Sequence, residues 1–280
     1  MLETQTKTPK NNATVDSDKS NLEKLEKRIF RKVGTAISDF NMIEEGDRIL
    51  VAVSGGKDSW VLLHVLNELK KRAPIHFDLI VVNIDQGYAG FRQDLIDDFL
   101  ETKDIKRDMQ YFDIATLLDE KMKDGSVPCS LCARLRRGAL SGAAKKLECN
   151  KIALGHHLDD FIETLLLNEF FSGRVATMAP VLQPEESPER VIRPLVYVPE
   201  SDIIEFAKSE GFPIVCCQCP LMCGENTHID HKRRYIKTLL KTLQKDIPEI
   251  KNSLIASMGR VQPSHMLDRD IWDFTKMEKK

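Results

Sequence analysis

The chain has 280 residues, which is enough for one large domain or for one domain with sizeable additions. Hydrophobic residues make up 42% of it, so a packed core is expected, yet no apolar run approaches the roughly 20 residues that a membrane span requires. The formal net charge of −2 gives no strong basic field, so any contact with nucleic acid must come from local patches. With no secretory signal after Met1, these properties predict a cytoplasmic protein without a membrane partner.

The first elements predicted along the chain are a tail and a helix. Residues 1–20 are polar and rich in Thr, Lys, Asn and Asp, which predicts a disordered tail. Apolar residues then recur at three- and four-residue steps from Leu22 to Phe40, and this spacing predicts an amphipathic helix ending near Asn41. We therefore assign 21–47 to an N-terminal helical segment.

Short β-rich runs then alternate with helical patterns. The strands are expected at 49–53, 79–84, 109–114 and 151–154. The helices are expected at 59–71, 93–103, 131–147 and 159–171. This alternation predicts an α/β fold with a Rossmann-like parallel sheet that is covered by helices on both faces, within a domain spanning 48–200.

The pattern changes after residue 171. A short strand at 191–195 and an amphipathic helix at 201–209 precede a cysteine-rich segment. Two more helices are expected at 231–245 and 250–258. We assign 201–274 to a helical, cysteine-containing segment that completes the site, and 275–280 to a second tail.

The most informative motif joins the first strand of this sheet to the helix after it. It consists of Ser54, Gly55, Gly56, Lys57, Asp58 and Ser59. Glycines let the backbone approach an anion closely, and the helix N-terminus offers unpaired N–H groups and a partial positive charge. The spacing differs from a Walker A loop and suits cleavage of ATP between its α and β phosphates. An ordinary tight turn is the alternative.

Two side chains of this loop have expected roles in catalysis. Lys57 would stabilise the charge that develops on the leaving pyrophosphate. Asp58 would orient the loop or bind Mg²⁺, since an acid beside phosphates requires a counter-charge.

Polar groups also follow the second and fourth strands. Ligands bind beyond the carboxyl ends of parallel strands, and Asp85 and the run 155–160 stand at such ends. Gly155 and His156 are expected beside the nucleotide. Asp160, with Asp159 as its substitute, is expected to hold Mg²⁺ or to orient the reacting base. A polar loop that caps a helix is the alternative for this run.

Cys129 and Cys132 form a Cys-x-x-Cys motif at a loop-to-helix junction, where a helix N-terminus favours the thiolate form. Such a pair can be a redox couple, half of a metal site or two inert thiols. Arg134, Arg136 and Arg137 follow it, either to bind phosphates or to form a solvated helix face.

Four further cysteines stand close together at positions 216, 217, 219 and 223. In a reducing compartment such crowding favours metal binding over disulfides. They would form a self-contained zinc site, or one or two of them would join Cys129 and Cys132 in a shared site. Cys149 stands alone and is predicted to be inert. Downstream, the basic helix at 231–245 predicts either RNA contact or a solvated face.

Taken together, these segments resemble the tRNA 2-thiocytidine synthetases, the TtcA family of the PP-loop ATP pyrophosphatase superfamily. The resemblance covers residues 21–274 and implies an adenine nucleotide alpha hydrolase-like fold, with the PP-loop ATP-binding domain at 48–200. The matching stretches are 40–47, 54–59, 128–138, 152–160, 192–195 and 262–265.

The resemblance also implies a reaction. ATP adenylates the 2-oxo group of cytidine 32 in the tRNA anticodon loop, and sulfur from a cysteine desulfurase then displaces AMP. A [4Fe–4S] cluster on three cysteines relays the sulfur, and Cys129, Cys132 and Cys217 match those ligands. The extra cysteines leave Cys216, Cys219 and Cys223 as alternatives for the third ligand.

Two further expectations come from the same resemblance. Related thiouridine-forming enzymes have a lysine where Arg136 stands, and because a guanidinium rarely gives up a proton, Arg136 is assigned charge stabilisation. Similar proteins are dimers, so a homodimer is expected. The competing functions are another PP-loop tRNA-modifying enzyme, such as a thiouridine former or a lysidine synthetase, and a zinc-stabilised nucleotide- or RNA-binding protein.

Overall fold

A mixed six-stranded sheet forms the centre of the fold in the computed structural model, which describes residues 12–105, 107–121, 129–185, 187–216, 218 and 231–276. The strand order across the sheet is β3-β2-β1-β4-β6-β5. The strands are β1 (Arg48–Ala52), β2 (Asp78–Asp85), β3 (Arg107–Tyr111), β4 (Lys151–Ala153), β5 (Val181–Leu182) and β6 (Arg190–Ile192).

The predicted parallel sheet is confirmed for five of these strands. β1 pairs in parallel with β2 and β4, β2 with β3, and β4 with β6. The edge strand β5 differs, because it runs antiparallel to β6. Its two residues are too few to give an alternating pattern, so the sequence offered no signal for it.

The third strand ends earlier than the 109–114 range predicted for it. β3 stops at Tyr111, and Ile114 already begins the next helix. The carboxylate of Asp113 accepts a hydrogen bond from the backbone N–H of Thr116 at 3.0 Å, as an N-cap residue does. This cap converts the end of the expected strand into the start of a helix.

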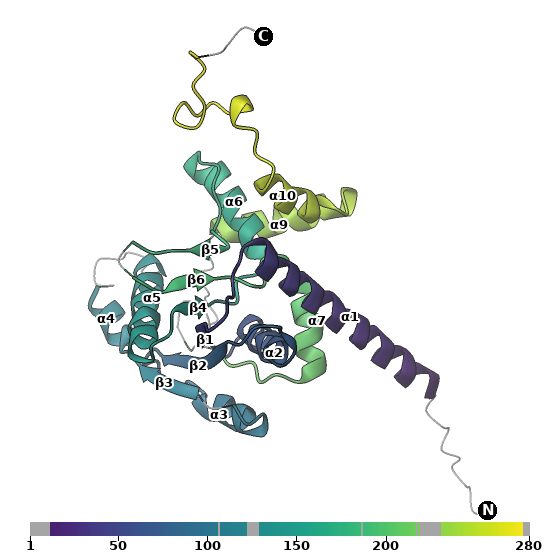
Figure 1. Ribbon diagram of the computed structural model, residues 1–280, viewed down its shortest axis with the longest axis vertical. Helices are drawn as coiled ribbons and strands as arrows, with labels where there is room; N and C mark the ends of the chain where they lie inside the picture. Colours follow the sequence, from purple (N-terminus) through teal and green to yellow (C-terminus); the bar gives the residue numbers. More distant parts are fainter. Residues whose placement is uncertain are drawn as a thin grey trace, which may run out of the picture. The chain divides into compact units, whose positions relative to one another are not determined.

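Helices connect the strands and extend the chain at both ends (Figure 1). They are α1 (Asn12–Asp39), α2 (Lys57–Arg72), α3 (Gln93–Thr102), α4 (Ile114–Lys121), α5 (Cys129–Lys146), α6 (Leu158–Ser172), α7 (Glu200–Glu210), α9 (His231–Asp246), α10 (Ile250–Met258) and the 3₁₀ turn η2 (Pro263–His265).

Helix α1 corrects one expectation, because it begins at Asn12 and therefore includes residues predicted to lie in a disordered tail. Leu25, Ile29 and Val33 form the buried face that anchors this helix. Once such a face is packed, each added residue costs little because it gains one backbone hydrogen bond. The polar composition of the first residues did not reveal this extension.

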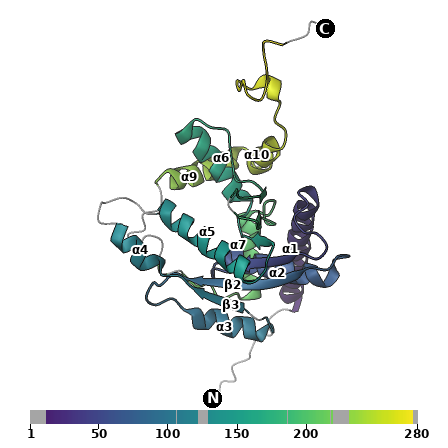
Figure 2. The same cartoon turned by 60° about the vertical axis from the view of Figure 1, so that its left-hand side comes forward.

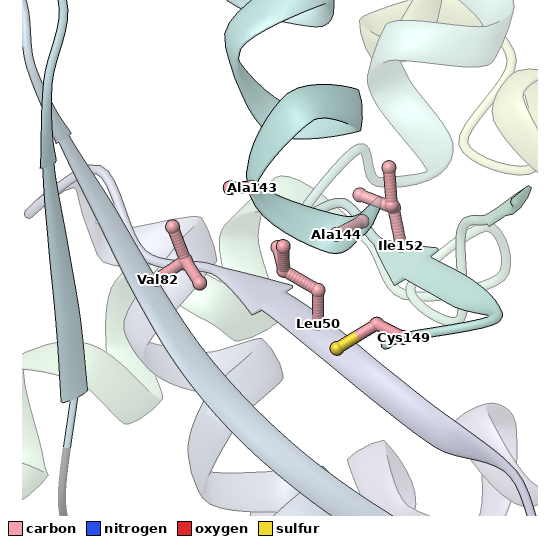
Figure 3. Close-up of a cluster of buried hydrophobic side chains, with 6 residues drawn as sticks. All are labelled: Leu50, Val82, Ala143, Ala144, Cys149 and Ile152. Atoms are coloured by element: carbon pink, nitrogen blue, oxygen red, sulfur yellow. The ribbon is translucent and has the colours of Figure 1, made fainter. Parts of the chain in front are cut away.

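Both faces of the sheet carry helices, as predicted. Helix α5 lies on one face and α2 on the other (Figure 2). Figure 3 shows the core beneath α5, where Ala143 and Ala144 pack against side chains of the strands. Small residues on the helix let its backbone approach Leu50, Val82 and Ile152 closely, so this part of the sheet is well covered.

The chain divides into two compact units. One contains the described residues within Met1–Leu158 and Ala179–Ile229, and the other contains those within Asp159–Met178 and Asp230–Lys280. The sequence placed a boundary at residue 200, whereas α7 falls in the unit that holds the sheet. Among the described residues, no helix is both long and apolar enough to cross a membrane.

Buried charge holds the second unit together. The carboxylate of Asp159 lies 2.5 Å from the Lys251 ammonium, which joins α6 to α10. Glu163, only 3% exposed, lies 3.5 Å from both Arg233 and Lys237 of α9. Two cations of the predicted basic helix therefore neutralise a buried acid of their own unit.

Candidate functional site

The loop between β1 and α2 is built from the inside by its two serines. The hydroxyl of Ser59 donates to the carbonyl of Gly56 at 2.8 Å and accepts from the backbone N–H of Ser54 at 3.2 Å. The Ser54 hydroxyl in turn lies 3.5 Å from the N–H of Gly56, the residue that precedes α2. These contacts hold the loop open at the helix N-terminus, which is an anion-binding geometry.

Gly55 allows a distant segment to lie against this loop. Its φ of +83° is in the left-handed region, and a Cβ there would lie 2.9 Å from the Cβ of Val215. The carbonyl of Gly55 accepts the Val215 N–H at 2.9 Å, and the Trp60 indole donates to the Pro213 carbonyl at 2.8 Å. The segment that enters the downstream cysteines at Cys216 is therefore fixed beside the loop.

Gly155 brings the end of β4 to the same loop. A Cβ at this position would lie 3.0 Å from the carbonyl carbon of Asp58 and 3.2 Å from the Ser59 nitrogen, so only glycine fits without movement. Two residues later, the buried His157 places its Nε2 atom 3.7 Å from the Asp58 carboxylate. The first and third sequence motifs thus meet in space.

The side chain of Lys57 lies between two acids. Its ammonium is 3.1 Å from the carboxylates of both Asp58 and Glu200. Burial disfavours the charged form, but the two neighbouring carboxylates outweigh this effect and raise the pKa of Lys57. The lysine is therefore a permanent cation at neutral pH, as binding of a phosphate requires.

A small cavity of about 40 Å³ opens where β1 and β2 end, next to the loop. Its lining includes Ser54 from the loop, Gln86 after β2 and Arg136 from α5. The thiol of Cys132, on the second turn of α5, lies 3.9 Å from the side-chain oxygen of Gln86. The cavity therefore connects the phosphate loop with the Cys-x-x-Cys helix.

Many of the predicted site residues come together around the phosphate loop and its cavity. They are Ser54, Lys57, Asp58, Gly155 and Arg136.

Asp85 has a local contact instead. Its carboxylate accepts the N–H of Gly87 at 2.9 Å and so closes the turn after β2, while the neighbouring Gln86 faces the cavity. His156 is half-buried at the end of β4. Asp160 is half-buried in the first turn of α6 and belongs to the second unit.

The cysteines are only partly within the described residues. Cys132 is half-buried, whereas for Cys129 only the backbone is described, as the first residue of α5. Cys217 lies outside the described residues, and so do positions 219 and 223. Cys216 is exposed and disulfide-bonded, contrary to the expectation that these cysteines bind a metal in preference to forming disulfides.

This arrangement fits an iron–sulfur cluster through its donor chemistry. A half-buried thiol near a helix N-terminus and beside the polar side chain of Gln86 is an environment in which thiolates bind such clusters. Within the described part of the chain, no group of three or more His, Cys, Asp or Glu side chains could hold a metal ion.

Three residues of the site were not selected from the sequence. Gln86 follows directly on a strand end, so the carboxyl-end rule could have found it. His157 was named within its motif, but His156 was chosen as the nucleotide contact. Glu200 had no sequence signal, because its pairing with Lys57 depends on the packing of α7 against α2.

Comparisons with known proteins agree with this geometry. Residues 25–216 match a family described as the PP-loop domain. A tRNA-cytidine(32) 2-sulfurtransferase from Syntrophotalea carbinolica is 51% identical over 89% of this chain and 96% of its own length. One from Geotalea uraniireducens is also 51% identical, over 89% and 97%.

A solved structure is similar as well. It is the U34-tRNA thiolase NcsA from Methanococcus maripaludis with its [4Fe-4S] cluster, at a TM-score of 0.70 and 26% identity. The match covers 86% of this chain and 81% of that one.

Proposed function

Because this chain belongs to the PP-loop tRNA-cytidine(32) 2-sulfurtransferase family, we propose that it converts cytidine 32 of tRNA to 2-thiocytidine in an ATP-dependent reaction. It is an enzyme of the transferase class. The observation that carries the proposal is the convergence of the phosphate loop, Arg136 and, through Gln86, Cys132 around one small cavity. A nucleotide and a sulfur-bearing group are needed at one place for this reaction, and the cavity adjoins residues suited to both.

The first step activates the base. The 2-oxo oxygen attacks the α-phosphorus of ATP, the bond to the bridging oxygen breaks, and pyrophosphate leaves with the electron pair. Ser54, Ser59 and the N–H groups at the start of α2 bind the departing phosphates. Lys57 turns from Asp58 and Glu200 toward the pyrophosphate and stabilises its added charge.

The second step replaces the activated oxygen. Sulfur bonds to carbon 2 of the base, and the carbon–oxygen bond breaks to release AMP. Arg136 lines the cavity and stabilises the negative charge of the departing AMP. Cys129, Cys132 and a third cysteine, with Cys217 as our first choice, would hold a [4Fe–4S] cluster. When bound, this cluster supplies an iron with an open position that presents the sulfur atom.

Other parts of the proposal rest on the sequence and on general chemistry. Mg²⁺ would accompany ATP, held by Asp160 or Asp58. The contacts of Asp58 with Lys57 and His157 favour its loop-orienting role. His156 and Asp85 would lie near the nucleotide. We also propose a cysteine desulfurase as the sulfur donor, a homodimer and a cytoplasmic location.

The test is to purify the protein and its Cys132→Ala variant without oxygen. We expect iron and sulfide in the original protein, and formation of 2-thiocytidine when ATP, a sulfur donor and tRNA are supplied. The variant should lose most of its iron and all measurable thiolation, because one cluster ligand is missing. Cys149→Ala is the matched control and should keep both properties, since that thiol lies in the core.

Product analysis distinguishes the competing functions. Thiolated uridine in place of thiolated cytidine would indicate the thiouridine-forming alternative. Colourless, zinc-loaded protein that does not release pyrophosphate from ATP in the presence of tRNA would contradict the enzymatic proposal.

A further inference from the structure

A groove lies on the other side of helix α5 from the small cavity beside the phosphate loop. It runs between α5 and the strands β4, β6 and β5, and all of its lining residues belong to one unit. Its floor is apolar and includes Leu154 and Val191. The volume of about 440 Å³ is within the roughly 300–1,000 Å³ of typical small-ligand sites.

Three arginines line this groove, and the most buried one lacks full hydrogen bonding. Arg193 is only 8% exposed, and one end of its guanidinium donates to the Ala179 carbonyl at 2.5 Å. Its Nε atom is buried, with no hydrogen-bond partner among the described residues. Burial, followed by the like charge of Arg137, lowers the pKa of Arg193. A bound anion would relieve both effects.

The other two cations are available for a ligand. Arg134 and Arg137 are exposed on α5, and neither forms an ion pair with a carboxylate of the described chain. The groove also contains one acid, Glu189, which is 2% exposed. Its carboxylate accepts hydrogen bonds from Ser141 and Ser187, so its partners are hydroxyls and none of the three arginines. The net character of the groove is cationic.

Guanidinium groups above an apolar floor match the chemistry of a nucleotide. Arginine binds phosphate oxygens in a bidentate manner, and its plane also stacks on bases. An apolar floor suits the flat face of an unstacked base, as in single-stranded RNA recognition. Leu140 lines both this groove and the small cavity beside the phosphate loop, so the two adjoin each other across α5.

We propose that this groove binds one nucleotide of the RNA substrate next to the reacting cytidine, with its phosphate on Arg134, Arg137 and Arg193 and its base on the apolar floor. The inference rests on the proposed function for the identity of the RNA. It adds a docking subsite that positions the anticodon loop while the cytidine reacts beside the phosphate loop.

The first test measures the affinity of the full-length protein for an anticodon stem–loop RNA containing cytidine 32, without ATP. Arg137→Ala should weaken binding about tenfold, because a charge-assisted hydrogen bond is lost. The slope of log affinity against log salt should also decrease by about 0.7, the value for one phosphate contact on a single strand. Arg193→Gln should show the same loss of RNA affinity. A thermal unfolding measurement on this variant checks that it remains folded. Arg31→Ala, an exposed arginine that lines neither site, is the control and should bind normally.

The second test locates the RNA. 4-Thiouridine placed beside cytidine 32 should crosslink to the peptide spanning residues 182–193, and excess ATP should not prevent the crosslink. Displacement by ATP or AMP would overturn the inference and assign the groove to a free nucleotide. Unchanged RNA affinity and salt slope in Arg137→Ala would also overturn it.

These outcomes separate the groove from the reaction. If the original protein thiolates tRNA and Arg137→Ala does so with the same KM, only the groove inference fails. If the RNA crosslinks to the groove but no thiolated cytidine forms under any condition, the proposed function fails and the RNA site remains.

Discussion

Two residues without side chains assemble the site at the residue scale. Gly55 admits the segment around Val215, and Gly155 admits the end of β4 to within contact of Asp58. Each glycine is needed because a Cβ would meet atoms at 3.0 Å or less. The close approach of three chain segments thus depends on the absence of a Cβ atom at these two glycines.

Replacing Gly155 with alanine should disturb the phosphate loop itself. The new Cβ would press on the backbone of Asp58 and Ser59, which cannot move without displacing the start of α2. We expect kcat/KM for ATP to fall about 100-fold, because a misplacement of the phosphate-binding groups by about 1 Å has an effect of that size. The rate of pyrophosphate release measures this change. Gly142→Ala is the control, because nothing lies within 4 Å of its added Cβ, and it should keep normal activity. Normal kinetics in Gly155→Ala would contradict the role of close packing.

Cys149, which the sequence predicts to be inert, is buried in the hydrophobic core. Cys149 is 4% exposed and packs with Leu50 and Ile152 (Figure 3), and burial raises the pKa of its thiol. Iodoacetamide at pH 8 should therefore modify Cys149 only after unfolding, as measured by mass spectrometry of peptides. Modification in the native protein would show that the core opens there.

The same raised pKa predicts a dependence of stability on pH. Because the folded-state pKa of Cys149 is higher than the unfolded value of about 8.5, the folded protein holds this proton more tightly. Its contribution to stability is complete below about pH 8.5 and is lost as the pH rises through the folded-state pKa. The free energy of unfolding should thus fall more steeply with pH in the original protein than in Cys149→Ala above that value.

At the scale of elements, α5 and α7 decide which residues meet. Helix α5 begins at Cys129 and carries Arg136 into one cavity and Arg137 into the groove on its other side. Helix α7 supplies Glu200 to the loop lysine and is itself tied to α1 by the ion pair between Asp202 and Arg28. The position of the loop therefore depends indirectly on the N-terminal helix.

The link between α1 and α7 should contribute measurably to stability. Both guanidinium nitrogens of Arg28 contact the carboxylate of Asp202, at 2.9 and 3.0 Å, and Asp202 is 7% exposed. Arg28→Ala should lower the free energy of unfolding by about 1–3 kcal/mol, because a buried acid loses its partner. Lys70→Ala breaks an exposed pair with Asp78 and should cost less than about 1 kcal/mol. Urea unfolding measures the loss of stability in both variants. Equal losses would contradict the idea that burial of Asp202 makes its ion pair the more stabilising one.

At the scale of the whole molecule, each of the two units has its own stabilising interactions. The first is organised by the sheet and its apolar core, and the second by apolar packing together with buried acids on α6 that meet cations of α9 and α10. Arg233 and Lys237 of the basic helix α9 are therefore engaged with the buried Glu163, and they are not fully available for contact with RNA.

Removing one of these cations should loosen the second unit alone. Lys251→Met takes away the ammonium 2.5 Å from the buried Asp159, and we expect amides of α9 and α10 to exchange with solvent faster. Amides of β1 and β2 should be unaffected, because they belong to the other unit. Lys241→Met, at an exposed position of α9, is the matched control. Uniformly faster exchange throughout the chain would show that the two units unfold together.

The sequence by itself determined the elements and the kind of chemistry. Glycines between a strand and a helix, alternating apolar runs and paired cysteines are local patterns, and each of them depends only on neighbours in the chain. The parallel direction of the main strands, the phosphate loop and the convergence of polar groups at strand ends could therefore be predicted. The same rules missed β5 and misplaced the end of β3, since a two-residue strand and a single N-cap give weak local signals.

Only the tertiary structure decided which side chains meet across long stretches of chain. Glu200 at Lys57, His157 at Asp58 and Gln86 at Cys132 are contacts that depend on how helices pack on the sheet. The cationic groove likewise arises because Arg193 directly follows β6, the neighbour of the edge strand β5, and lines the same groove as two arginines of α5. Local patterns predict what a residue can do, and packing of distant segments selects its partners.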